Sequence, residues 1–143
     1  MNETRSVEQV LLQDGVFVST TSGVSMWPLF RDRRDTIVVT KPNGRLKKYD
    51  VPLYRRGNEY VLHRIVNVLP DSYVICGDNC LAKEHGITDA DIVGVLTEFY
   101  RGDKHYTVAD IRYRVYVRVW VALYPLRLFS KLLRSRLTRL KKH

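Results

Sequence analysis

Residues 59–69, EYVLHRIVNVL, alternate in a way that is typical of a β-strand with one buried face. Because successive side chains of a strand point to opposite sides, His63 is expected on one face with Val61 and Ile65. Arg64 is expected on the other face. A single histidine among apolar neighbours is usually a core residue, so this stretch by itself predicts a strand and nothing more.

Runs of the same kind follow one another along the chain on both sides of this stretch. They are VFVST (16–20), DTIVVTK (35–41), DVPLYRR (50–56), SYVICGD (72–78), DIVGVLTEFY (91–100) and KHYTVAD (104–110). The breaks between several of them, PNGR, RRGN and LPDS, contain residues that tolerate left-handed geometry or pre-set a turn. The pattern predicts a mainly β fold, built as a twisted sheet or a partly open barrel.

Helices are expected only at the two ends of the chain. In residues 6–13, SVEQVLLQ, the apolar side chains of Val7, Val10 and Leu11 have helical spacing, and Gly15 follows as a stop signal. Beyond residue 110, five large apolar residues fall on one helical face: Leu126, Phe129, Leu133, Leu137 and Leu140. Three basic residues lie opposite them: Arg127, Lys131 and Arg134. Pro125 either kinks this basic amphipathic helix or lies in the first turn of a second helix.

The net charge of +9 is unevenly distributed. Residues 1–110 hold 14 Lys and Arg together with all 15 Asp and Glu, whereas residues 111–143 hold ten Lys and Arg and no acid. The excess positive charge therefore belongs to the C-terminal segment. We expect a body over residues 1–110 and a basic helical tail over residues 111–143.

Cysteine content and hydropathy exclude several classes of protein. Cys76 and Cys80 are the only cysteines, and without a nearby pair of histidines they fall short of the four ligands of a structural zinc. We therefore expect reduced thiols, no metal and no cofactor. The longest apolar run, residues 119–126, is far below the roughly 20 residues that a bilayer span requires. The sequence predicts neither a signal peptide nor a transmembrane helix.

Three segments carry side chains that can perform chemistry together. The first, TSGVSMWPL at residues 21–29, has small residues that let a bound peptide approach the backbone, and it exposes Ser25. The second is the strand with His63. The third, residues 76–95, offers Asp78, Asn79 and Glu84 in an expected loop. Each segment is unspecific alone, since most serines are solvated hydroxyls and Asp-Asn pairs commonly form turns.

Taken in order, the three segments resemble type I signal peptidases and their self-cleaving relatives such as LexA, over roughly residues 16–98. In that superfamily the nucleophile lies in a Ser-Gly-x-Ser-Met-x-Pro stretch, similar to residues 22–28 with Ser25 in the nucleophile position. Archaeal and endoplasmic-reticulum members have His-Arg where bacterial enzymes have Lys-Arg, and His63-Arg64 resembles the former. Residues 77–79 match a following Gly-Asp-Asn box. The resemblance implies the partly open, β-barrel-like catalytic fold of these enzymes over residues 1–110.

The third catalytic member is open between two acids. Enzymes of the endoplasmic-reticulum type place a pair of aspartates after the Gly-Asp-Asn box, ahead of an Arg-Gly, and the similar place here reads KEHG at residues 83–86. If Gly86 matches that glycine, Glu84 takes the position of the orienting aspartate. A glutamate can hold a histidine tautomer much as an aspartate does. Asp78 is the alternative.

The resemblance implies a serine endopeptidase that cleaves a precursor or leader peptide. Ser25 attacks a peptide carbonyl, and His63 takes its proton and returns it to the leaving amine. The Ser25 amide is the natural oxyanion donor, with the Ser22 hydroxyl or the Gly23 amide as alternatives for the second. Ser22, Gly23 and Met26 are therefore the residues expected to bind the substrate or the oxyanion next to Ser25.

Two other readings stay open. One is a non-catalytic peptide-binding member of the same fold, and the other is a regulator of the LexA type whose basic tail contacts nucleic acid. No DNA-binding helical segment is recognisable ahead of Ser25. We therefore expect a peptide or protein substrate and do not expect nucleic acid as a partner.

The tail also has two readings. It is either a helix packed on the body with a solvated basic face, or a peripheral contact with an anionic membrane. Tyr116, Trp120 and Tyr124 supply amphipathic aromatic rings that favour a membrane interface. We expect a cytoplasmic chain that contacts the inner face of the membrane through residues 111–143.

Overall fold

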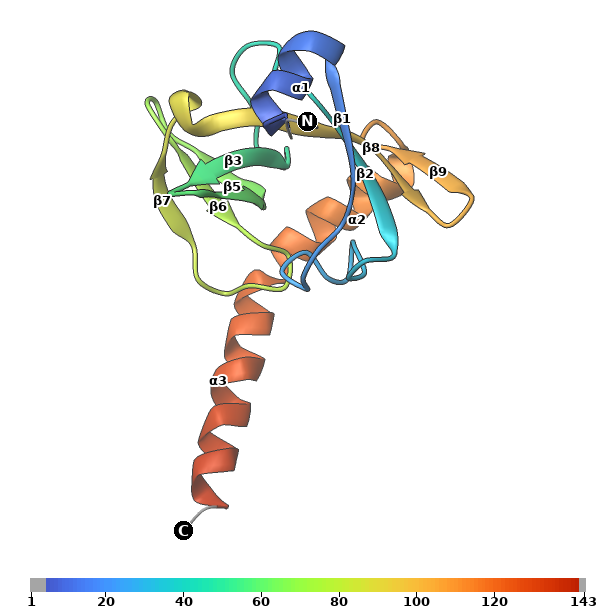
Figure 1. The fold of residues 1–143 in the computed structure, drawn as a ribbon. Coiled ribbons are helices and arrows are strands. Elements are labelled where there is room, and N and C mark those ends of the chain that lie inside the picture. The colour runs from blue at the N-terminus through green and yellow to red at the C-terminus, as the bar shows by residue number, and fades with distance from the viewer. Residues whose placement is uncertain (1–4, 142–143) are drawn as a thin grey trace.

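A curled antiparallel sheet forms the larger part of the body (Figure 1), as described for residues 5–141 of a computed structural model. Its strands follow the order β1 (Val16–Thr20), β2 (Asp35–Thr40), β8 (Ile92–Arg101), β3 (Pro52–Arg56) and β4 (Glu59–Leu62). A further strand, β9 (Lys104–Thr107), pairs with the second half of β8. The ten residues of β8 allow it to pair with three strands, so it organises the sheet.

A second antiparallel sheet completes the half-barrel. Its order is β5 (Arg64–Val68), β6 (Tyr73–Cys76) and β7 (Glu84–Ile87), and the short 3-10 helix η1 (Asp89–Asp91) leads from it back to β8. The prediction of a mainly β fold is therefore confirmed. The sequence runs did not predict β7, which contains a glycine and only one β-branched residue.

The single strand predicted for residues 59–69 is wrong, because the structure divides it into two strands. β4 ends at Leu62 and pairs with β3, whereas β5 begins at Arg64 and pairs with β6 in the other sheet. His63 lies at the crossing between the sheets. The expected alternation is lost there, because His63, Arg64 and Ile65 are buried in succession where the chain passes between two sheets.

The opening helix is confirmed as α1 (Val7–Asp14). The Ser6 side chain accepts a hydrogen bond from the Gln9 amide at its start, and Gly15 ends it with a left-handed φ of 75°. Leu11 is the one residue of this helix that is buried. The helix covers the end of the body opposite to α3 (Figure 1).

The core consists of two apolar clusters. The larger cluster joins the loop after β1, through Met26, Leu29 and Phe30, to the inner faces of β2, β3 and β8. The smaller cluster lies under the second sheet and contains Tyr54, whose ring is fully buried. Burial of the loop anchors in the larger cluster fixes the segment around Ser25 relative to the sheet.

Two helices of different character follow the sheet: α2 (Ile111–Ala122) and α3 (Tyr124–Leu140). Pro125 lies in the first turn of α3, which confirms the second of the two alternatives. Tyr113 and Val117 of α2 belong to the larger core cluster, whereas α3 buries no residue and extends away from the body (Figure 1). The change in packing thus falls after Ala122 rather than after residue 110, because charge does not report on which face of a helix is buried.

Candidate active site

Ser25 lies in a tight loop that follows β1. Backbone hydrogen bonds from the Trp27 amide to the Val24 carbonyl, 3.1 Å, and from the Phe30 amide to the Met26 carbonyl, 3.0 Å, shape this loop. The side chains of Met26 and Phe30 are buried beneath it. Ser25 is half-buried at the surface that results, where its hydroxyl can meet a bound molecule.

Ser25 and His63 line the same cavity, which has a volume of about 600 Å³. Ser22, Gly23 and Met26 also line it, so the structure brings the residues of the serine motif together with His63. Within residues 5–141, no hydrogen bond joins the Ser25 hydroxyl directly to the His63 ring. Catalytic hydrogen bonds are often long in the absence of substrate and tighten when it binds.

The Nδ1 atom of His63 faces a hydroxyl and a carboxylate. It lies 3.3 Å from the Tyr54 hydroxyl, which donates to Glu84 Oε1 at 3.0 Å, and it lies 3.9 Å from Glu84 Oε1 itself. Because the one proton of the tyrosine hydroxyl is given to Glu84, the hydroxyl oxygen can accept only from a protonated Nδ1. We assign the His63 tautomer from this network, and it leaves Nε2 as the basic nitrogen.

Burial and neighbouring charges keep the His63 ring neutral and the Tyr54 hydroxyl protonated. Burial lowers the pKa of His63, partly opposed by the negative charge of Glu84, so the ring is neutral at pH 7. Burial and the neighbouring Glu84 raise the pKa of the Tyr54 hydroxyl, which therefore keeps its proton. The Arg56 guanidinium binds Glu84 Oε1 at 2.6 Å. Glu84 is thus held at the start of β7, not in a loop as the sequence suggested.

Asp78, the alternative third member, has a different set of partners. Its carboxylate accepts from Arg64 Nε at 2.8 Å and from Arg64 Nη2 at 2.9 Å, and both side chains are buried. Arg64 also donates to the Tyr113 hydroxyl, and the Tyr116 hydroxyl donates to Asp78 at 3.2 Å. Of the two acids, only Glu84 lies beside His63 Nδ1, so the geometry favours Glu84 as the orienting group.

The Gly-Asp-Asn segment binds the serine loop directly. The Asn79 amide donates to the Ser25 carbonyl at 2.9 Å, and the Asn79 side chain donates to the Val24 carbonyl at 3.0 Å. A Cβ atom on Gly77 would lie 2.7 Å from the Ser25 carbonyl oxygen and 3.1 Å from His63 Cδ2. Only glycine leaves room for the serine loop and the histidine to approach each other this closely.

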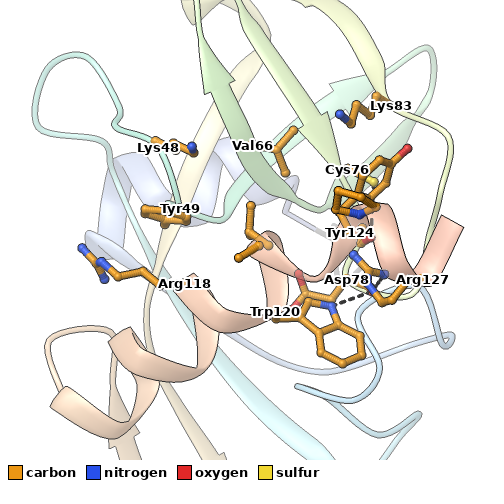
Figure 2. A pocket seen from close by; sticks show the side chains of 14 residues that line it. Lys48, Tyr49, Val66, Cys76, Asp78, Lys83, Arg118, Trp120, Tyr124 and Arg127 are labelled. Carbon is orange, nitrogen blue, oxygen red and sulfur yellow. Dashed lines mark hydrogen bonds between the residues drawn. The ribbon is translucent and has the colours of Figure 1, made fainter. Parts of the chain in front are cut away.

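The C-terminal helices hold the same segment from its other side. Trp120 and Arg127 both donate to the Asp78 carbonyl at 2.8 Å, and the Tyr124 hydroxyl donates to the Leu81 carbonyl at 2.6 Å. Figure 2 shows these side chains around a second cavity, of about 390 Å³, at the junction of α2 and α3. The expectation that Tyr116, Trp120 and Tyr124 face a membrane is wrong, because their polar atoms bind the body.

The oxyanion donors proposed from sequence are only partly available. The Gly23 amide donates to Asp32 Oδ1 at 2.7 Å, so it is occupied. Ser22 is exposed at the mouth of the cavity, and the backbone amide of Ser25 lies in the loop beside it. Met26 is a buried anchor whose sulfur accepts from the Asp78 amide. The Ser25 amide and the Ser22 hydroxyl remain as candidate donors.

Cys80 is the other potential nucleophile at this cavity. Both cysteines are free thiols, and burial raises the pKa of Cys80 above its ordinary value and that of Cys76 to about 11. The thiolate is the reactive form of cysteine, so these thiols are poor nucleophiles at neutral pH. In the part of the chain that the structure describes, no group of three or more His, Cys, Asp or Glu side chains is arranged to hold a metal.

Sequence reasoning missed two residues of this site, Tyr54 and Arg56. Both lie on β3, and Tyr54 reaches Glu84 across 30 positions of the chain. No local pattern marks such a residue, because an inward-facing tyrosine on a strand is usually a core residue. No protein-family model matches the chain, and no curated protein is found to be similar to it.

Proposed function

We propose that this chain is a serine endopeptidase that cleaves a precursor or leader peptide, similar to the Ser-His signal peptidases, and that its half-barrel is their catalytic fold. One observation carries the proposal: Ser25 and His63 open onto one cavity, while Tyr54 and Glu84 engage Nδ1 of His63. A serine nucleophile and its base must also come within hydrogen-bond distance, and we expect substrate binding to bring Ser25 and His63 that close.

The chemistry follows from the protonation state of the network. His63 Nε2 removes the proton of the Ser25 hydroxyl as its oxygen attacks the carbonyl carbon of a peptide bond. The Nδ1 proton stays hydrogen-bonded to Tyr54, and Glu84 stabilises the imidazolium that forms. Nε2 then gives the proton to the leaving amine. Nε2 next takes a proton from a water molecule as its oxygen attacks the acyl carbon, and it gives that proton to the Ser25 oxygen as the ester bond breaks.

The test is covalent labelling, because it needs no known substrate. A fluorophosphonate probe added to the full chain is expected to phosphonylate Ser25, identified by peptide mass spectrometry. Ser25→Ala should abolish labelling, and His63→Ala should slow it about a hundredfold or more, because these residues act as a unit. Ser130→Ala, at an exposed position of α3 outside the cavity, serves as the control and should label normally.

A non-catalytic peptide-binding protein is the competing function. The observation in its favour is that, within residues 5–141, no hydrogen bond joins the Ser25 hydroxyl to the His63 ring. This competing function predicts no labelling of Ser25 together with peptide binding that Ser25→Ala leaves unchanged. Labelling that persists in Ser25→Ala and is blocked by alkylation of Cys80 would assign the nucleophile to the cysteine instead. Either result would refute the proposal.

A further inference from the structure

The helix α3 presents an apolar surface that no other part of the described chain covers. Five large side chains on one side of it are each between 48% and 72% exposed: Leu126, Phe129, Leu133, Leu137 and Leu140. After its first turns, where Tyr124 and Arg127 bind the body, the helix extends away from it (Figure 1). Burial of this surface, which we call the apolar stripe, is a strong driving force for association.

The apolar stripe is turned away from the body. Successive residues of an α-helix are rotated by about 100°, so Leu126, Leu133 and Leu137 lie within roughly 20° of one direction. Arg127 and Tyr124, whose side chains bind the carbonyls of Asp78 and Leu81, lie about 100° and 160° from it. Whatever covers the stripe can therefore bind without breaking the contacts between α3 and the body.

The surroundings of the stripe are uniformly positive. From residue 111 onward the chain has ten Lys and Arg and no acid. Lys48 and Lys83 of the body line the cavity at the base of α3, which extends the positive surface onto the body (Figure 2). A partner for this surface must therefore be apolar where it meets the stripe and negatively charged around it.

Other occupants fit these two properties less well. A second copy of α3 would bring two helices without any acid together, and like charges at an interface are repulsive. Nucleic acid complements the positive charge, but its phosphate backbone provides no apolar surface against which the leucines could be buried. An anionic bilayer has both an acyl region and negative headgroups.

We propose that α3 binds the surface of an anionic membrane, with the apolar stripe in the acyl boundary and the basic side chains at the headgroups. The 17 residues of α3 are about 26 Å long and include five Lys and Arg. Within residues 5–141, no helix has the length and apolar character needed to cross a bilayer. The helix therefore lies in the plane of the interface. This inference does not rest on the proposed peptidase activity.

The experiment is co-sedimentation of the full chain with vesicles of pure phosphatidylcholine or of phosphatidylcholine mixed with phosphatidylglycerol. Binding is expected to the mixed vesicles and to weaken as salt rises, because the headgroup attraction is screened beyond a Debye length. The double variant Leu133→Gln/Leu137→Gln should weaken binding at least about tenfold, since it removes two side chains from the acyl boundary. The matched control Ser135→Gln/Thr138→Gln alters the polar side and should bind normally.

Three results would overturn the proposal. Equal binding of the leucine variant and the control would show that charge alone holds the chain to the vesicles. Self-association of the chain without lipid, abolished by the leucine substitutions, would assign the stripe to a second copy. Tight binding of nucleic acid with no vesicle binding would assign the basic surface to phosphates. The thermal unfolding temperature should be the same for all variants, because α3 contributes nothing to the core.

Discussion

Gly77 is the residue on which the closeness of the two catalytic candidates depends. A methyl group there would lie 2.7 Å from a backbone oxygen of Ser25, and backbone cannot yield as the end of a side chain can. We expect Gly77→Ala to displace the serine loop and to slow fluorophosphonate labelling of Ser25 at least about tenfold, since small misplacements of reacting groups are costly. Labelling at the normal rate in a folded Gly77→Ala variant would show that the approach is not required.

The pH dependence of labelling reports on His63. Its pKa is lowered from 6.5 by burial, so the basic form predominates at pH 7 and is lost as the pH falls through the lowered pKa. We therefore expect an acidic limb with a midpoint below 6.5 and a plateau at neutral pH. Measuring the labelling rate from acidic to neutral pH checks this.

Glu84→Gln tests whether the carboxylate acts through His63. The negative charge of Glu84 raises the pKa of His63, so its removal should shift the acidic limb to lower pH. The plateau should also fall, because the imidazolium loses its stabilising charge. A fall of the plateau with no shift of the limb would indicate a role that does not involve the histidine.

How far sequence reasoning reached differs between these residues. Ser25 and His63 could be selected as catalytic candidates because three motifs occur in one order along the chain, although none of the motifs is specific by itself. Tyr54 could not, because its role depends on a contact between β3 and β7 that only the folded chain creates. Between the two acids the sequence pointed to Glu84 only through the match of Gly86 and kept Asp78 as the alternative, since both follow the strand that contains Cys76.

At the scale of elements, the ion pair between Arg64 and Asp78 joins β5 to the loop that follows β6. Asp78→Asn leaves the buried guanidinium without its counter-charge, and breaking a buried pair in this way costs about 3–5 kcal/mol of unfolding free energy. We expect denaturant unfolding to show this loss, while Glu84→Gln, at a half-exposed site, changes stability much less. A catalytic defect without loss of stability in Asp78→Asn would return the orienting role to Asp78.

The buried ion pair between Arg64 and Asp78 also bears on the single strand that was predicted for residues 59–69, which the structure divides at His63. Alternation predicts a strand as long as one face is buried and the other is solvated. At His63 the chain leaves one sheet and enters the other, so both faces are covered and Arg64 is buried against a carboxylate. The individual strands could be predicted because their β-branched residues are local signals, whereas the crossing depends on distant partners.

At the scale of the whole molecule, α2 and α3 combine contacts to the candidate site with an exposed apolar surface, a combination that the sequence did not predict. Charge alone divides the chain at residue 110, yet α2 supplies Tyr113 and Val117 to the core, and Trp120 and Arg127 hold the loop that carries Gly77. The tail is therefore partly scaffold and partly free surface. A division of this kind is visible only when burial is known for each helix face.

This arrangement predicts that the cavity works close to a membrane, and the prediction rests on both proposals. A peptide that the chain cleaves in solution should be cleaved faster when it is linked to a lipid in anionic vesicles, because α3 raises the effective concentration of the cavity at that surface. A chain ending after Ser130 keeps Tyr124 and Arg127, and with them the contacts to the loop, but loses most of the apolar stripe. The shortened chain should cleave the soluble peptide as fast as the full chain does. It should no longer cleave the lipid-linked peptide faster than the soluble one. Rates are followed by mass spectrometry of the released fragment, and an unchanged advantage in the shortened chain would contradict the idea that α3 delivers the site to the membrane.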